Sequence, residues 1–178
     1  MENLYELSLE FTRWLQENYP ELEGFFVAIS ALGREQFYLA VLPLVYWCIN
    51  KKLGRVLGYT FFAAIVINTT LKHGLRSPRP FWIDPQVGID TTEGYGIPSG
   101  HTQYVTMIYF LVAAAVGGFW AWLVAGILIA LMALSRIYVG AHFIQDVVGG
   151  FAVGVILLAA ALFWVQRLAR PFQKRILG

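Results

Sequence analysis

The chain has 178 residues, of which 58% are hydrophobic and 16% aromatic, while only 13% are charged, and its net charge is +2. Soluble domains usually carry about 25% charged residues. The composition therefore argues against an ordinary soluble domain and favours a protein embedded in a membrane, and we expect no nucleic-acid partner.

The first 20 residues are predicted to form an amphipathic helix. Apolar side chains recur there at helical spacing, and the charged residues lie off that stripe. The stripe consists of Leu4, Leu7, Phe11, Trp14 and Leu15. We expect this helix, over residues 1–20, to lie on the membrane surface or against a helical bundle. The alternative is a soluble helix that packs on a partner.

Five apolar segments follow, and they predict transmembrane helices. They cover roughly residues 35–50, 54–74, 101–117, 119–138 and 145–168. The third and fourth come from one stretch of 34 residues, between His101 and Arg136, that contains no Asp, Glu, Lys or Arg. One helix of that length would measure about 50 Å, too long for a hydrocarbon core of about 30 Å. We therefore expect a turn at Gly117-Gly118.

These elements predict an all-α integral membrane protein with a single domain over residues 1–178. The distribution of basic residues predicts its orientation. Alternating spans place the basic clusters at 51–55 and 167–175 on one side, directly at the membrane ends. The positive-inside rule puts such clusters in the cytoplasm. We therefore expect a multi-pass protein of the cell (inner) membrane with a cytoplasmic C-terminus and with residues 72–101 and 136–146 facing the outside or periplasm.

Three polar stretches that are far apart in the sequence are predicted to meet on this outer side. They are KHGLRSPRP at 72–80, IPSGHT at 97–102 and SRIYVGAHFIQD at 135–146. Charged groups near a bilayer are costly to bury and usually mark a functional site. Their convergence therefore predicts one site at the outer end of the bundle.

The contents of the three stretches predict a pocket for a compact anion. Lys72, Arg79 and Arg136 supply three cations, and an arginine side chain can bind two phosphate oxygens at once. Ser99 and Gly100 stand where a helix begins, so backbone N–H groups form an anion seat there and the Ser99 hydroxyl adds a donor. We interpret these residues as phosphate-binding.

Two histidines supply the chemistry of that pocket. His142 and Asp146 are four residues apart, so on a helix the carboxylate would hold one ring nitrogen while the other attacks. His101 comes from another helix and would protonate the leaving oxygen and then activate water. A zinc site is the alternative, but three nearby cations oppose a divalent ion. We therefore expect neither a metal nor a cofactor.

The three stretches resemble the motifs of the type 2 phosphatidic acid phosphatase superfamily. The matching residues are Lys72-x6-Arg79-Pro80, Pro98-Ser99-Gly100-His101 and Ser135-Arg136-x5-His142-x3-Asp146. The resemblance implies a metal-independent membrane lipid phosphatase that works through a phosphohistidine on His142, with Asp146 as its partner and His101 as acid and base. It also implies that Lys72, Arg79, Ser99, Gly100 and Arg136 bind phosphate. Family members often have six spans, against the five predicted here.

The resemblance implies a lipid substrate without selecting one. Undecaprenyl diphosphate, phosphatidylglycerol phosphate, phosphatidic acid and lipid A phosphates are all implied, and outward orientation and small size favour the first by analogy. The acidic, aromatic loop 81–97 is expected to form a lid or rim over the pocket. Two other functions stay open. One is vanadate-dependent haloperoxidase chemistry, against which the apolar spans argue, and the other is a lipid transporter or scaffold that retains the fold.

Overall fold

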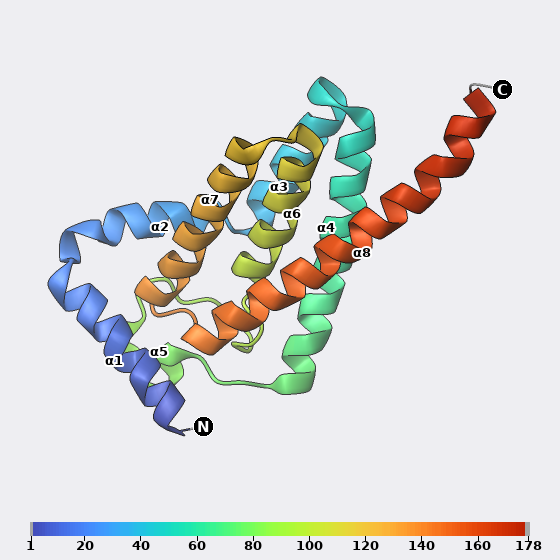
Figure 1. Ribbon diagram of the computed structural model, residues 1–178. Helices are drawn as coiled ribbons and strands as arrows, with labels where there is room; N and C mark the ends of the chain where they lie inside the picture. The colour runs from blue at the N-terminus through green and yellow to red at the C-terminus, as the bar shows by residue number, and fades with distance from the viewer. Residues whose placement is uncertain (1, 177–178) are drawn as a thin grey trace.

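The computed structural model describes residues 2–176, and the side chains of residues 3–164. All regular structure in this part of the chain is helical, which confirms the predicted all-α fold (Figure 1). The elements are α1 (Glu2–Asn18), η1 (Pro20–Leu22), α2 (Glu23–Ala31), α3 (Glu35–Leu44), the π-helical turn η2 (Val45–Ile49), α4 (Lys51–Leu75), α5 (Pro80–Ile83), η3 (Pro85–Val87), α6 (Gly100–Val116), α7 (Phe119–Tyr138) and α8 (Ile144–Ile176).

Each predicted span coincides with a helix, but the first one differs from the prediction. Residues 35–50 correspond to α3 and η2, which form only the second half of a helix pair, α2 with α3, that bends by 53°. By length and composition alone, Lys51–Ile83, Phe119–Tyr138 and Ile144–Trp164 are each able to cross a membrane, and the bent pair would be a fourth span. α6 has 17 residues and lies in the middle of the bundle, against α4, α7 and α8.

Local sequence explains where the long helices begin and end. The Asn50 side chain caps α4 by accepting hydrogen bonds from the backbone N–H groups of Lys52 and Leu53, at 2.9 and 3.0 Å. The predicted turn between α6 and α7 is confirmed, because Gly117 and Gly118 adopt positive φ angles of 77° and 83° that favour glycine. The chain therefore reverses there, and α6 and α7 lie side by side (Figure 1).

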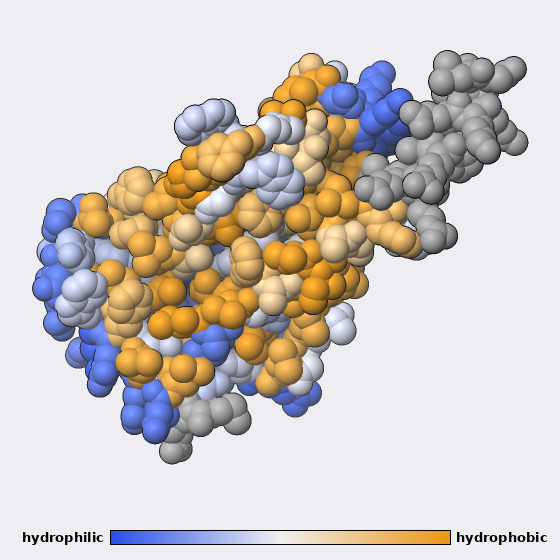
Figure 2. Space-filling view, in the orientation of Figure 1, coloured by the Kyte–Doolittle hydropathy of each residue, from blue (hydrophilic) through white to orange (hydrophobic). Residues whose placement is uncertain are grey.

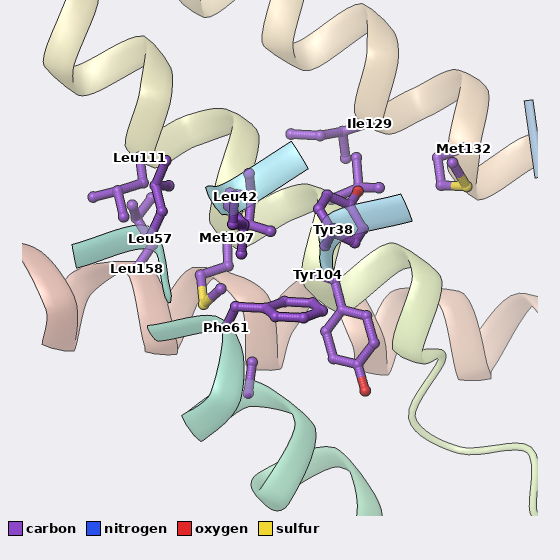
Figure 3. Close-up of a cluster of buried hydrophobic side chains, with 13 residues drawn as sticks. Tyr38, Leu42, Leu57, Phe61, Tyr104, Met107, Leu111, Ile129, Met132 and Leu158 are labelled. Atoms are coloured by element: carbon purple, nitrogen blue, oxygen red, sulfur yellow. The ribbon is translucent and has the colours of Figure 1, made fainter. Parts of the chain in front are cut away.

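The core sits between α3, α4, α6, α7 and α8. Its centre is aromatic: the ring centroids of Tyr38 and Phe61 are 5.2 Å apart, and those of Phe61 and Tyr104 are 5.3 Å apart (Figure 3). Leu57, Met107 and Leu158 pack around them and are almost fully buried. This core fixes α6 against α4, and so fixes the first turn of α6 at the end of the bundle where α8 also begins.

Two glycines of α8 bring it close to α6. A Cβ added to Gly154 would lie 2.8 Å from the backbone oxygen of Gln103, and one added to Gly150 would collide with the backbone oxygen of Ser99. Such small residues let helix backbones approach closely within a membrane. The Gly150-x3-Gly154 pattern therefore serves packing within the bundle.

The outer surface of the bundle is largely apolar, as Figure 2 shows for one face. Large side chains such as Phe62, Val66, Ile156 and Trp164 are more than half exposed. An apolar surface of this extent would be a liability in water and suits contact with lipid tails. The fold is thus that of an integral membrane protein. The basic cluster at 167–175, used above to orient it, lies outside the described side chains.

α1 runs across the end of the bundle at which α7 ends and α8 begins (Figure 1). One of its faces is buried there and includes Ser8, Leu9 and Leu15. Most of the predicted apolar stripe faces the other way, since Leu7 is 57% exposed and Trp14 48%. The helix therefore packs on the bundle with one face and presents a second, apolar face outward.

Candidate active site

A cavity of about 110 Å³, the size of a few water molecules, lies at the end of the bundle where α6 and α8 begin. The ends of α3, α4 and α6 surround it, together with Arg79 just before α5, the loop after η3 and the connection between α7 and α8. Its lining residues are Gly33, Glu35, Asn68, Lys72, Arg79, Thr92, Glu93, Gly100, His101, Tyr104 and His142. Five of the predicted site residues, drawn from all three polar stretches, therefore share one small cavity.

His142 lies in the short connection between α7 and α8 and is almost fully buried. Its Nδ1 is 3.3 Å from Oδ2 of Asp146, in the first turn of α8. The same Asp146 oxygen accepts the Phe143 backbone N–H at 3.1 Å, so it is fixed in place. This arrangement holds the imidazole by one nitrogen and leaves Nε2 for chemistry.

The ionisation state of His142 suits a nucleophile. Burial, followed by the positive charges of Arg79, Arg136 and Lys72, holds its pKa well below the ordinary value. The imidazole is therefore neutral near neutral pH, and a neutral nitrogen has the free electron pair that attack on phosphorus requires.

His101 enters the cavity from the first turn of α6. Its Nε2 is buried and has no hydrogen-bond partner among the described residues. Gly33 lies against the ring, because a Cβ there would be 2.6 Å from Cδ2 of His101. The free nitrogen is therefore available to a group that enters the cavity.

The two arginines differ in how they are held. The Arg79 guanidinium donates to Gly94 O, Thr92 Oγ1, Ala141 O and Glu93 O at 2.6 to 3.1 Å, so most of its donors hold the 92–94 loop and the α7–α8 connection. Arg79 is thus an anchor of the cavity rim as well as one of its cations.

Arg136 is fully buried near the end of α7 and does not line the cavity. Its Nη1 lies 3.1 Å from Asp90 Oδ2 and also donates to the Ser30 hydroxyl. In the described part of the chain, its Nε and Nη2 have no partner. Its backbone oxygen accepts the N–H groups of Ala141 and His142, which ties it to the connection between α7 and α8.

Ser99 likewise does not line the cavity. It caps α6, with its hydroxyl oxygen accepting from the Thr102 backbone N–H and from the Thr102 hydroxyl, and its own N–H donates to Asp146 O at 2.9 Å. Gly100 does line the cavity, as predicted. The PSGH segment thus joins the start of α6 to the start of α8.

Several polar residues at the site were missed by the sequence analysis. Asn68 donates to Pro98 O and to Gln103 Oε1, and so links α4 to the start of α6 within the membrane. Asn68 and Gln103 are polar residues inside predicted spans, and such a position could have indicated that they belong to the site. Ser30 and Glu35 flank the break between α2 and α3, and no local motif indicates them.

Asp90, from the loop between η3 and α6, was also missed. Its carboxylate bonds to Arg136, to the Ser30 hydroxyl at 3.0 Å and to Arg34 at 3.2 Å. Burial alone would raise the pKa of Asp90, but Arg136, Ser30 and Arg34 outweigh it and hold the pKa below its ordinary value. Asp90 thus joins the loop, α2 and α7 while remaining ionised.

The fold and the site together define a helical membrane protein with a polar cavity lined by two histidines, Lys72 and Arg79. Comparison with known proteins agrees with this class. Residues 53–170 match the family model described as the PAP2 superfamily, so the chain belongs to that superfamily.

Known relatives differ in what they act on. Mouse sphingosine-1-phosphate phosphatase 2 is 32% identical over 138 residues, which are 73% of this chain and 39% of the relative. Undecaprenyl-diphosphatase of Sulfolobus acidocaldarius is 30% identical over 138 residues, 75% of this chain and 66% of that protein. This chain thus spans about two fifths of the mouse relative's length.

A solved structure shows the same fold. The transmembrane PAP2-type phosphatidylglycerolphosphate phosphatase from Bacillus subtilis superposes with a TM-score of 0.77. The match covers 93% of this chain and 86% of the other, at 21% sequence identity. The transmembrane architecture inferred from the apolar surface is therefore that of a known membrane enzyme fold.

Proposed function

We propose that this protein is a membrane-embedded lipid phosphatase that cleaves a phosphate ester or diphosphate without a metal ion. The observation that carries the proposal is a buried neutral His142, held by Asp146, in a cavity shared with two cations and His101. Family membership and the phosphatase names of the relatives support it.

The proposed reaction has two steps. His142 Nε2 attacks phosphorus, the bond from phosphorus to the lipid oxygen breaks, and His101 gives that oxygen a proton. Water then attacks the phosphohistidine while His101 takes its proton, and inorganic phosphate leaves. Lys72, Arg79 and the Gly100 N–H at the start of α6 would stabilise the charge on the phosphoryl oxygens throughout, with Arg136 and Ser99 holding their surroundings in place.

We propose a lipid phosphate in the outer leaflet as the substrate. The relatives cover polyprenyl diphosphates and lipid monophosphates, and both chemistries present the same terminal phosphoryl group. The loop 81–97 contributes Thr92 and Glu93 to the cavity, so we propose that it shapes the choice of headgroup. Replacing this loop with that of a relative should shift substrate preference, and an unchanged preference would contradict its role.

The test of the activity is phosphate release by the detergent-purified protein in the presence of EDTA. Undecaprenyl diphosphate, phosphatidylglycerol phosphate and phosphatidic acid would be compared. His142→Ala should abolish turnover, because it removes the nitrogen proposed to attack phosphorus, and the other imidazole of the cavity, His101, is assigned to proton transfer. Release that survives this substitution would refute the phosphohistidine mechanism. If the well-folded protein released phosphate from none of the lipid phosphates, the result would favour a transporter or scaffold.

We further propose that the cavity faces the outside or periplasm and the C-terminus the cytoplasm. The support is the basic cluster at 51–55, at the end of the bundle away from the loop that carries Gln86 (Figure 1). Cys48 is the only cysteine, so a Cys48→Ser background allows single labels. An impermeant maleimide added to intact spheroplasts should label Gln86→Cys but not Lys52→Cys. The reverse pattern would overturn the orientation.

We propose that the outward face of α1 lies in the membrane interface. The support is its apolar exposed face, with Leu7 at 57%, beside the charged, exposed Glu6. In proteoliposomes of the Cys48→Ser background, a spin label at Leu7→Cys should relax more with oxygen than with a water-soluble nickel chelate. A label at Glu6→Cys should show the converse. Equal accessibility at both positions would contradict membrane contact.

A further inference from the structure

Glu35 places a negative charge in a cavity that two cations, Lys72 and Arg79, also line. It stands in the first turn of α3, directly after the break that follows α2, and it lines the same cavity as Lys72 and Arg79. A phosphate group that enters the cavity would be repelled by this carboxylate. The residue therefore weakens phosphate binding unless it serves another part of the ligand.

The described side chains offer Glu35 no cationic partner. No lysine, arginine or histidine nitrogen among them lies within 4 Å of its carboxylate, and the neighbouring Arg34 pairs with Asp90 instead. Lys72 lines the same cavity and also has no ion pair in this part of the chain. Lys72 and two carboxylates without an ion pair among the described side chains, Glu35 and Glu93, thus line one space of about 110 Å³. Glu93 belongs to the loop, whereas Glu35 stands on a helix.

One contact fixes the Glu35 carboxylate. The hydroxyl of Tyr104, one turn after His101 on α6, donates to Glu35 Oε1 at 3.0 Å. Tyr104 is itself buried in the aromatic core, so the carboxylate is held by a rigid element. Both carboxylate oxygens can accept more than one hydrogen bond, so this contact leaves capacity for a ligand.

From this juxtaposition we propose that Glu35 binds an ammonium group of the substrate, beside the seat of its phosphate. The inference rests on the proposed lipid phosphatase function. The ligand class is a lipid phosphate monoester with a free amine on the carbon next to the one that carries the ester, as in a sphingoid base 1-phosphate. Its phosphate would meet Lys72 and Arg79 while its ammonium meets Glu35, so Lys72 and Glu35 each gain a partner of opposite charge.

The experiment compares two lipids that differ only at the amine: sphingosine 1-phosphate and its uncharged N-acetyl derivative. The kcat/KM of each is measured with the full-length protein in mixed micelles. Wild type should prefer the free amine by about tenfold or more, the range of a hydrogen bond to a charged group. Glu35→Gln keeps an acceptor for Tyr104 but loses the charge, so this preference should fall to near unity.

The direction in which kcat/KM changes for each lipid distinguishes a Glu35 that binds the ligand from a Glu35 that only supports the fold. In Glu35→Gln, kcat/KM should fall for the amine and hold or rise for the N-acetyl lipid, since a repulsive charge is gone. Glu35→Asp keeps the charge and should keep a preference for the amine. Glu23→Gln is the matched control, because Glu23 occupies the first turn of α2 but does not line the cavity; it should leave the ratio unchanged.

Three results would overturn the proposal. An equal loss on both lipids in Glu35→Gln would mean that Glu35 only supports Tyr104. A wild type without preference for the amine would also refute it. Hydrolysis of phosphatidic acid without hydrolysis of either sphingoid lipid would refute the ligand class while leaving the phosphatase function intact. If no lipid phosphate is hydrolysed, the proposed function itself fails.

Discussion

The ion pair between Asp90 and Arg136 offers the sharpest test of how the site is held together. Arg136 is fully buried, and Asp90 is the only carboxylate bound to it among the described side chains. Asp90→Asn removes the negative charge and nearly preserves the shape of the side chain. The arginine would then keep its charge in a buried position with only neutral partners such as Ser30.

The magnitude follows from the distance and the burial. Two unit charges 3.1 Å apart attract by about 5 kcal/mol at an effective dielectric constant of about 20. Measured losses on breaking buried pairs are about 3–5 kcal/mol. Because Asp90 is 12% exposed and asparagine still accepts a hydrogen bond, we expect a loss of about 3 kcal/mol. For a chain of this size that corresponds to a fall in Tm of roughly 6–12 °C.

The assay is thermal unfolding in one detergent, with Asp84→Asn as the matched control. Asp84 is on the same loop and pairs with Arg13 at 2.6 Å, but the Arg13 side chain is 49% exposed. Such surface pairs contribute at most about 1 kcal/mol. Orthovanadate, as a phosphate mimic, should raise the Tm of Asp90→Asn more than that of wild type, because a bound anion restores a counter-charge. If the two variants had the same Tm and showed the same rise in Tm with vanadate, the dependence of Arg136 on Asp90 would be refuted.

Three other outcomes are expected from the structure. The acid limb of the kcat/KM profile should lie below pH 6.5, because His142 has a lowered pKa and stays neutral there; a limb above pH 6.5 would contradict this. Asp90 has a lowered pKa in the folded state, so its contribution to stability is present above its ordinary pKa of about 3.9 and is lost as the pH falls further; Asp90→Asn should show a smaller drop in Tm below pH 4. Gly154→Ala should cost about 1–3 kcal/mol in a denaturation assay, since its Cβ would lie 2.8 Å from a backbone oxygen, whereas Gly126→Ala, with no atom within 4 Å, should be neutral or stabilising.

The sequence was sufficient to bring the main residues of the site together. Alternating spans put the ends of three helices on one side, and Lys72, Gly100, His101 and His142 do line a single cavity. That prediction needed only span lengths and the positions of polar residues in apolar surroundings. The predicted contact between His142 and Asp146 is present, but the helix expected to hold both residues begins only at Ile144, so His142 lies in the connection before α8.

The bend between α2 and α3 was beyond the reach of the same reasoning. Residues 20–31 have an apolar stretch too short to count as a span, so the first helix was expected to begin near residue 35. The structure joins both halves around Gly33, which packs against His101 and brings Glu35 to the cavity. The only signal of this bend in the sequence was the pair of charged residues Arg34-Glu35 between two apolar segments. The residues that bond to this pair in the fold are 55 or more positions away in the sequence, so local patterns do not identify them.

The roles of the two arginines could not be separated from sequence either, because a motif gives charge but not partners. Arg79 bonds to the 92–94 segment, and Arg136 bonds to Asp90. The loop segment 90–94 is therefore fixed at both ends by arginines that the sequence predicted to bind phosphate. The same charges therefore build the rim of the cavity and set its potential. We therefore expect a substitution at either arginine to change the shape of the rim as well as the charge around the cavity. Variants that keep the guanidinium but alter the loop, such as Thr92→Val at an Arg79 contact, are the way to separate the two effects.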